Sequence, residues 1–199
     1  MLSLFENRSP GIPDESNLQL LPQFGETKWA NKIYKQLRDE IEWDQYHIQI
    51  FGKRMPQPRL TAWYGETKAA YSYSGIQLIP KVFTPCLLKI KALVEEVCEQ
   101  KFNSVLLNLY RNQNDSMGWH SDDEKELGEN PIIASLSLGE TRVFQVRHKT
   151  QKALKGKLEL THGSLLIMKG EMQSNWQHAV PKSRKECGPR INLTFRKIY

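Results

Sequence analysis

The residues best suited to chemistry stand near the middle of the chain, in the stretch Trp119-His120-Ser121-Asp122-Asp123, directly after the turn-forming run NQNDSMG. Residues two apart on an extended chain share a face, so His120 and Asp122 point one way and Asp123 the other. Two histidines and one carboxylate form the triad that binds Fe(II) on one side and leaves three positions open. The stretch is therefore either a solvated loop or the first part of a metal site.

The second histidine of such a triad has three candidates further along the chain. His148 lies in the basic run RHKTQK, where a solvated loop is the simpler interpretation, and His162 lies in LTHGS, which is typical of a turn. His178, in NWQHAVPK, comes 56 residues after Asp122 and suits a jelly roll whose last strands return beside the first. Because such spacing also arises by chance, the pattern alone leaves the choice open.

The segment RINLTFR alternates polar and apolar residues, which predicts a strand with one polar face. Four side chains share that face: Arg190, Asn192, Thr194 and Arg196. The two arginines would stand roughly 20 Å apart, too far to bind one carboxylate but suited to the two ends of a small diacid. The alternative is the solvated face of an edge strand. By the same alternation Asn108 and Tyr110 share a face of the strand SVLLNLY.

The elements that must position these residues are mainly short strands. Apolar residues every fourth position predict a helix over 29–41, and Thr84-Pro85 is typical of the start of a second helix. Beyond Phe102, six apolar and β-branched runs are separated by turn residues: 104–110, 132–138, 141–147, 157–160, 164–168 and 190–195. Closely spaced short strands predict a sandwich or barrel.

Composition excludes several classes of protein. Apolar residues make up 39% and charged residues 25%, which is ordinary for a globular domain, and the net charge of +6 favours polyanionic partners such as nucleic acid. Three cysteines without a C-x-x-C spacing argue against a disulfide framework. No apolar run is long enough for a membrane helix and no secretory signal is apparent, so we expect an intracellular protein, cytoplasmic in a bacterium and nuclear or cytoplasmic in a eukaryote.

From Phe102 to its C-terminus the chain resembles the AlkB-type Fe(II)/2-oxoglutarate dioxygenases that repair alkylated nucleic acids. The resemblance rests on six motifs that occur in family order: FNSVLLNLYRN, WHSDDE, PIIASLSLG, HGSLLIM, WQHAVP and PRINLTFR. It implies an α+β, mainly β fold, a double-stranded β-helix (jelly roll) buttressed by N-terminal helices. We expect a loosely ordered N-terminal arm over 1–26, the helices and a nucleotide-recognition lid over 27–101, and the jelly-roll core over 102–199.

The resemblance also implies roles for individual residues. The Fe(II) ligands, and hence the catalytic residues, would be His120, Asp122 and His178. Those that bind 2-oxoglutarate would be Asn108, Tyr110, Arg190, Asn192 and Arg196, with Arg190 at the carboxylate far from iron and Trp63 lining the same pocket. Those that contact the damaged base would be Tyr71, Tyr73 and Asp123, with Tyr73 stacking on it.

Phe51 is a further candidate contact to nucleic acid. It breaks the alternation of the preceding strand and is followed by the basic residues Lys53, Arg54 and Arg59, as expected for a wedge that fills the gap left by a flipped base beside residues that bind phosphates. The alternative is a hairpin tip that folds back on the core. The stretch around Phe51 resembles the finger loop of duplex-preferring relatives, whereas RLTAWYGE and NLYRN resemble a relative that favours single strands. We therefore expect activity on both.

The implied activity is oxidative dealkylation of bases such as 1-methyladenine and 3-methylcytosine in DNA, with Fe(II), 2-oxoglutarate and O₂, by hydroxylation of the alkyl carbon and release of an aldehyde. RNA demethylation is the alternative within the family, and we expect a monomer. A metal-dependent hydrolase or nuclease is the rival from another class, but it leaves Arg190, Arg196, Asn108 and Tyr110 without a role. A jelly-roll binding module without catalysis is a third alternative, disfavoured by the complete ligand set.

Overall fold

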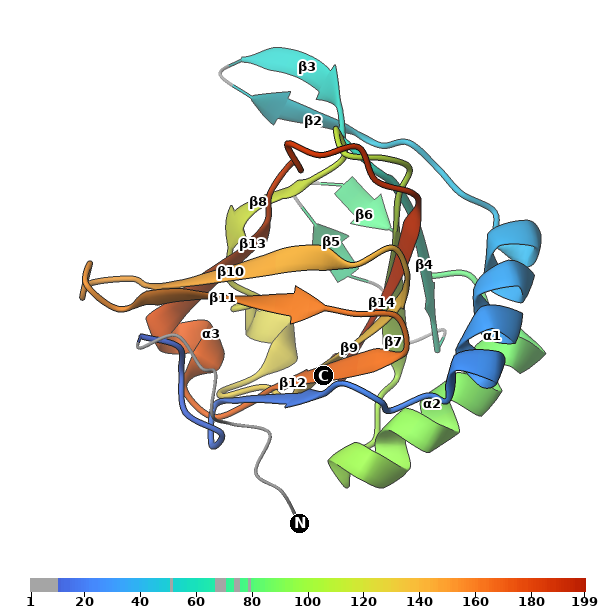
Figure 1. Cartoon of the computed structure of the whole chain (residues 1–199), viewed down its shortest axis with the longest axis horizontal. Coiled ribbons are helices and arrows are strands. Elements are labelled where there is room, and N and C mark those ends of the chain that lie inside the picture. The colour runs from blue at the N-terminus through green and yellow to red at the C-terminus, as the bar shows by residue number, and fades with distance from the viewer. Residues whose placement is uncertain (1–10, 51, 67–70, 74–75, 79) are drawn as a thin grey trace.

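Two antiparallel sheets form the body of the protein. A computed structural model describes residues 11–50, 52–66, 71–73, 76–78 and 80–199. The larger sheet has the strand order β1 (Leu18–Leu21), β12 (Ser164–Met168), β9 (Ile133–Gly139), β14 (Arg190–Arg196), β7 (Ser104–Tyr110) and β4 (Leu60–Gly65). The smaller sheet has the order β11 (Lys155–Leu160), β10 (Arg142–His148), β13 (Trp176–Val180) and β8 (Met117–His120). The predicted mainly β jelly roll is confirmed (Figure 1).

Helices α1 (Thr27–Glu40) and α2 (Pro85–Cys98) cover the outer face of the larger sheet, as Figure 1 shows. Helix α1 buries Ala30, Ile33 and Leu37 against it. Helix α2 begins as predicted, because the Thr84 side chain accepts a hydrogen bond from the Leu87 amide and a proline follows it. The two helices thus seal one face of the sheet with apolar contacts and leave its other face for the interior between the sheets.

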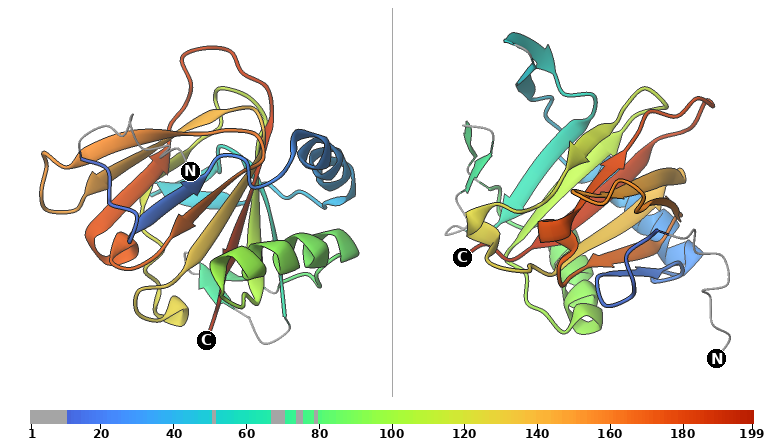
Figure 2. Two further views of the ribbon diagram at one scale, coloured as in Figure 1. Left: turned by 60° about the horizontal axis from the view of Figure 1, so that its bottom comes forward. Right: turned by 90° about the vertical axis from the view of Figure 1, so that its left-hand side faces the viewer.

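Two short hairpins and two short helical turns complete the described chain. The hairpins are β2 (His47–Ile50) with β3 (Lys53–Pro56), and β5 (Tyr71–Tyr73) with β6 (Ile76–Leu78). The β2–β3 hairpin stands clear of the two sheets in Figure 1 and in the right-hand view of Figure 2. The turns are α3 (Met172–Asn175) and a 3-10 turn at Lys125–Leu127. No helix among the described residues has the length and apolar character needed to cross a bilayer.

The expected loose arm over 1–26 is wrong for its second half. Strand β1 pairs with β12 along its whole length, and Leu18 is buried. The prolines and glycines that suggested irregular structure flank the short apolar run NLQLL and do not interrupt it. Four residues are enough to form a short strand at the edge of a sheet.

Strand β14 lies inside the larger sheet, between β9 and β7. Its apolar residues Ile191, Leu193 and Phe195 are fully buried on the helical side, as the alternation predicts. The polar face is buried as well, with Asn192 and Thr194 each 7% exposed, so the alternative of a solvated edge strand is wrong. A wholly polar face enclosed between two sheets requires hydrogen-bonding partners, which defines the candidate site.

Candidate active site

His120, Asp122 and His178, referred to below as the triad, meet between the smaller sheet and β14. His120 ends β8 and pairs directly with His178 of β13, and Asp122 follows two residues later. The two imidazole rings lie 4.3 Å apart, and one ligand atom from each of the three residues falls within 4.8 Å of the others. Among the described residues this is the only such cluster. The antiparallel pairing of β8 and β13 therefore brings together ligands that are far apart in the sequence.

The protonation states of the triad suit a divalent cation. Nδ1 of His120 lies 2.9 Å from the Gly118 carbonyl, to which it donates, so in the neutral ring the lone pair is on Nε2. Burial lowers the pKa of His178 to about 3, so this ring is neutral at pH 7. Burial acts to raise the pKa of Asp122, but the charge and the hydrogen bond of the Arg196 guanidinium act against it, and the net pKa is lowered. Two imidazoles and one ionised carboxylate are the donor set expected for Fe(II).

Neighbouring side chains hold the triad in place. Arg196 donates from Nη2 to Oδ1 of Asp122 at 2.6 Å, and the Gln173 side-chain oxygen accepts from the Asp122 amide at 2.9 Å. Phe144 stacks on the His178 ring at 5.3 Å with an interplanar angle of 24°. His178 Nδ1 is buried without a hydrogen-bond partner among the described residues. Contacts of this kind orient metal ligands in other proteins.

Arg190 marks the opposite end of the same pocket. It is 1% exposed and lies directly opposite Tyr110 across the β14–β7 pair. Its Nη2 donates to the Ser137 hydroxyl at 2.8 Å, while Nε and Nη1 have no hydrogen-bond partner in the described part of the chain. Burial lowers the pKa of Arg190 to about 10, which leaves it a cation at neutral pH. A buried cation with two unused donors fits a carboxylate group.

Polar side chains line the pocket between its two ends and are joined by hydrogen bonds. Asn192 donates to the Ser135 hydroxyl at 2.7 Å and accepts from Thr194 at 3.0 Å, while the Asn108 oxygen accepts from Arg59 at 2.8 Å. The predicted residues Asn108, Tyr110, Arg190, Asn192 and Arg196 all line this pocket together with the triad. The sheet therefore brings every predicted ligand of 2-oxoglutarate except Trp63 to one cavity.

Trp63 lines an adjoining, mostly apolar cavity. It stands in β4 opposite Leu106, and its neighbours there include Arg59 and Leu127. Leu106 and Arg196 line both cavities, so the two meet at the triad end of the pocket. Trp63 thus lies beside the pocket of Arg190, in the outermost strand of the sheet on this side, and its contact with 2-oxoglutarate stays a prediction.

Of the four residues predicted to contact nucleic acid, Asp123 is the one whose side chain the structure describes. Asp123 points outward as the alternation predicts, with 57% of its side chain exposed and an ion pair to Lys149 at 3.0 Å. Tyr71 and Tyr73 lie in β5, where the description extends to the backbone alone. Phe51 falls outside the described residues. The roles of these four residues stay predictions.

The other two candidate histidines have structural roles in turns. His162 accepts a hydrogen bond from the Gly139 amide at 2.8 Å, and His148 accepts from the amides of Thr150 and Gln151 at 3.2 and 3.0 Å. Neither belongs to the triad. The geometry therefore selects His178 among the three.

Several residues of the site went unnoticed in the sequence. Ser135 and Ser137 carried a usable signal, since they alternate in IASLSLG and period two puts them on one face. Arg142 and Gln173 carried none, and Arg59, expected among the basic residues that bind phosphates, is buried and donates to Asn108 instead. Each is buried by partners far away in the chain, such as Asp122 for Gln173.

Comparisons with known proteins agree with this geometry. Residues 17–196 match the sequence model of the family described as "2OG-Fe(II) oxygenase superfamily". The alpha-ketoglutarate-dependent dioxygenase alkB homolog 3 of Bos taurus is 46% identical over 193 residues, which are 92% of this chain and 67% of the relative. The DNA oxidative demethylase ALKBH2 of Mus musculus is 40% identical over 185 residues, 88% of this chain and 77% of the relative.

A solved structure supports the fold independently. The protein titled "The structure of OsALKBH1" matches with a TM-score of 0.69 at 16% identity, over 94% of this chain and all of that one. At this identity the likeness concerns the fold alone. The sequence comparisons carry the family, and the chain belongs to the 2OG-Fe(II) oxygenase superfamily and, within it, to the AlkB-type dioxygenases.

Proposed function

We propose that this dioxygenase binds Fe(II) and 2-oxoglutarate in the pocket described above and removes N-alkyl groups from nucleobases. The observation that carries the proposal is one cavity with a two-histidine, one-carboxylate triad at one end and a buried arginine with unused donors at the other. A metal hydrolase has no need of the second feature. A cosubstrate with a chelating group and a distant carboxylate uses both.

Each residue has a defined task in this proposal. His120, Asp122 and His178 hold the iron on one side, and Arg196 keeps the Asp122 carboxylate in place and ionised. Arg190 binds the carboxylate of 2-oxoglutarate far from the metal, with Tyr110 beside it. Bound iron and 2-oxoglutarate supply the oxidation with O₂. The protein surrounds the reacting groups with buried side chains that exclude water.

The proposed substrates are 1-methyladenine and 3-methylcytosine in DNA, with RNA as the alternative. Hydroxylation of an N-methyl carbon gives a hemiaminal that breaks down to formaldehyde and the unmodified base. The net charge of +6, the exposed Lys53 and Arg54 of β3 and the printed name of the ALKBH2 relative support a nucleic-acid substrate. A base in a duplex must be flipped out to reach the buried pocket, at a cost of a few kcal/mol.

The residues proposed to contact this substrate are Tyr71, Tyr73, Asp123 and Phe51. Tyr73 would stack on the extruded base, with Tyr71 beside it, and Asp123 would accept from the edge of the base after leaving Lys149. Phe51 would occupy the gap in a duplex. Trp63 is proposed to line the way in, beside the triad.

Formaldehyde release tests the proposal. Protein supplied with Fe(II), 2-oxoglutarate and O₂ should release formaldehyde from an oligonucleotide containing 1-methyladenine, and omission of 2-oxoglutarate or O₂ should stop it. Matched single-stranded DNA, duplex DNA and RNA oligonucleotides separate the alternatives. A nuclease would cut the strand without 2-oxoglutarate and O₂, and that result would contradict the proposal.

A further inference from the structure

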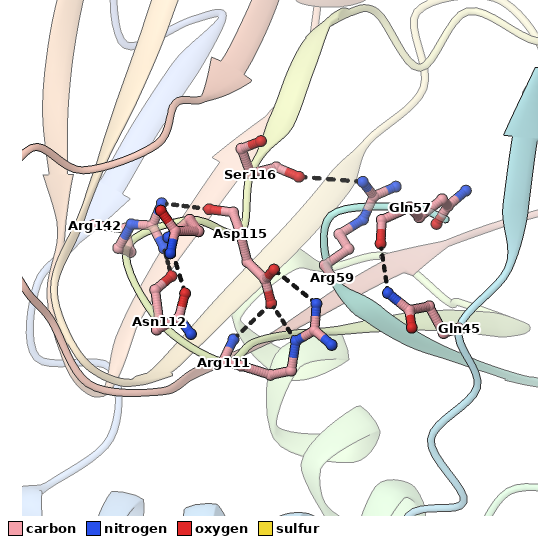
Figure 3. A network of polar contacts seen from close by, with 9 residues as sticks. Gln45, Gln57, Arg59, Arg111, Asn112, Asp115, Ser116 and Arg142 are labelled. Carbon is pink, nitrogen blue, oxygen red and sulfur yellow. Dashed lines mark hydrogen bonds and ion pairs between the residues drawn. The ribbon is translucent and has the colours of Figure 1, made fainter. Parts of the chain in front are cut away.

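Arg142 at the start of β10 is a second arginine buried beside the pocket, 3% exposed. It binds the turn between β7 and β8, which connects Tyr110 to the strand that ends at His120 (Figure 3). Its Nη2 donates to the carbonyl oxygens of Asp115 and Pro181 at 2.8 and 2.7 Å, and its Nη1 to that of Asn112 at 3.3 Å. Three carbonyl groups therefore solvate this guanidinium.

Arg142 forms no ion pair with a described carboxylate, although its charge helps to lower the pKa of Asp115. The nearby carboxylate of Asp115 is taken by Arg111, which donates to it from its backbone amide at 2.9 Å and from Nε and Nη2 at 2.8 and 2.9 Å (Figure 3). Carbonyl oxygens carry partial charge only. Arg111 and Arg142 thus share one carboxylate, and the net positive charge that remains is costly to bury unless an anion binds close by.

The guanidinium groups of Arg142 and Arg190 both lie against the ring of Tyr110, so two positive charges stand close together there. The guanidinium carbon of Arg142 lies 5.4 Å from the centre of the Tyr110 ring, and that of Arg190 lies 5.1 Å from the same centre. Contact with the face of an aromatic ring offsets part of the cost of each cation. Tyr110 thus joins two buried cations at the end of the pocket where the far carboxylate of the cosubstrate is proposed to bind.

We propose that Arg142 is a positioning residue of the cosubstrate site, which fixes Tyr110 beside Arg190 and selects a dicarboxylate over a monocarboxylate. The inference rests on the proposed function. Arg142 touches no cosubstrate in this proposal and acts through the Tyr110 ring and the turn. A purely structural role would affect metal binding, monoacids and diacids alike, because the same turn leads to His120.

The test measures binding of two 2-oxo acids without turnover. Protein loaded with Co(II) is titrated with 2-oxoglutarate and with 2-oxopentanoate, which has the same chain length but lacks the second carboxylate. Arg142→Met should raise the Kd for 2-oxoglutarate about tenfold and that for 2-oxopentanoate less than about twofold, because only the diacid uses the charge at this end. The Kd for Co(II) should stay unchanged.

Three further variants complete the test. Arg147→Met is the matched control, because Arg147 lies on the same strand but is exposed and donates to Gln177. Arg142→Lys should give an intermediate preference, since an ammonium keeps the charge but not the three contacts. In a Tyr110→Leu background, Arg142→Met should have little further effect if it acts through that ring.

The outcomes are distinguishable. The role of Arg142 would be overturned if Arg142→Met raised the Kd of both acids equally or lowered the affinity for Co(II) in parallel. An unchanged Kd for 2-oxoglutarate would overturn it as well. If Arg142→Met does not fold, the ratio of the two Kd values in Arg142→Lys decides in the same way. Wild-type protein that fails to prefer 2-oxoglutarate over 2-oxopentanoate would instead overturn the proposed function, and this inference with it.

Discussion

The two ends of the pocket each contain an arginine of β14, but their charges are balanced differently. At the triad end Arg196 pairs with Asp122 at 2.6 Å, so a cation and an anion offset each other, and the buried His178 is neutral. At the Arg190 end two guanidinium groups share Tyr110, and neither forms an ion pair with a described carboxylate. The charges cancel at one end of the pocket, and the other end is positively charged. Such a pocket is suited to a negatively charged ligand.

The largest expected effect comes from breaking the triad end. Asp122→Ala should lower metal affinity by more than about 100-fold, since changes to residues that only support a ligand already cost about 10–100-fold. Formaldehyde release should fall to background. His162→Ala, measured beside it by metal analysis after dialysis, should keep its metal. Loss of metal in His162→Ala together with retention in His178→Ala would mean that the third ligand is misassigned.

Arg190→Ala should weaken the binding of 2-oxoglutarate and leave the metal site intact. Removing a charge-assisted hydrogen bond of about 1.5–3 kcal/mol is expected to raise the Kd for 2-oxoglutarate about 10- to 100-fold. Metal affinity should not change, because Arg190 does not contact the triad. Arg190→Lys should restore part of the affinity. An unchanged Kd in Arg190→Ala, obtained by anaerobic titration, would rule out a carboxylate at this arginine.

A smaller effect is expected from Gln173, which supports the triad from α3. Gln173→Ala removes the acceptor of the Asp122 amide and should weaken metal binding about tenfold. The Kd for 2-oxoglutarate, measured at saturating metal, should stay within about twofold. The exposed neighbour Ser174 provides the control as Ser174→Ala. Equal metal affinity in the two variants would show that Asp122 holds its place without Gln173.

Ser137→Ala is the mildest change at the Arg190 end. It removes the hydroxyl that accepts from Nη2, a contact of about 1 kcal/mol, and should raise the Kd for 2-oxoglutarate about fivefold without affecting metal. Calorimetric titration resolves a change of this size. A shift in metal affinity instead would mean that the two ends are coupled through the sheet and not independent.

Local patterns in the sequence predicted a large part of this site. The alternation in RINLTFR and SVLLNLY depends only on strand geometry, and it placed Arg190, Asn108 and Tyr110 on the correct faces. The position of Asp123 on the outer side of the chain follows from the same rule. The selection of His178 needed either the resemblance or the pairing of β13 with β8, which no local pattern contains.

The remaining features depend on contacts between distant segments. Arg142 and Gln173 look like surface residues in the sequence, and their burial becomes visible only once β10 and α3 pack beside the β7–β8 turn and Asp122. Strand β1 was missed because four residues carry little pattern and their partner β12 lies far away in the chain. The motif around Trp63 does not specify which of two adjoining cavities its side chain lines, so this placement also depends on the fold.

The most direct test of the two-ended pocket is a crystal structure with Mn(II) and 2-oxoglutarate, in which anomalous scattering locates the metal. We expect one metal peak among His120, Asp122 and His178, and density for the far carboxylate against Arg190 beside Tyr110. A metal bound elsewhere, or a diacid whose second carboxylate lies away from Arg190, would contradict it.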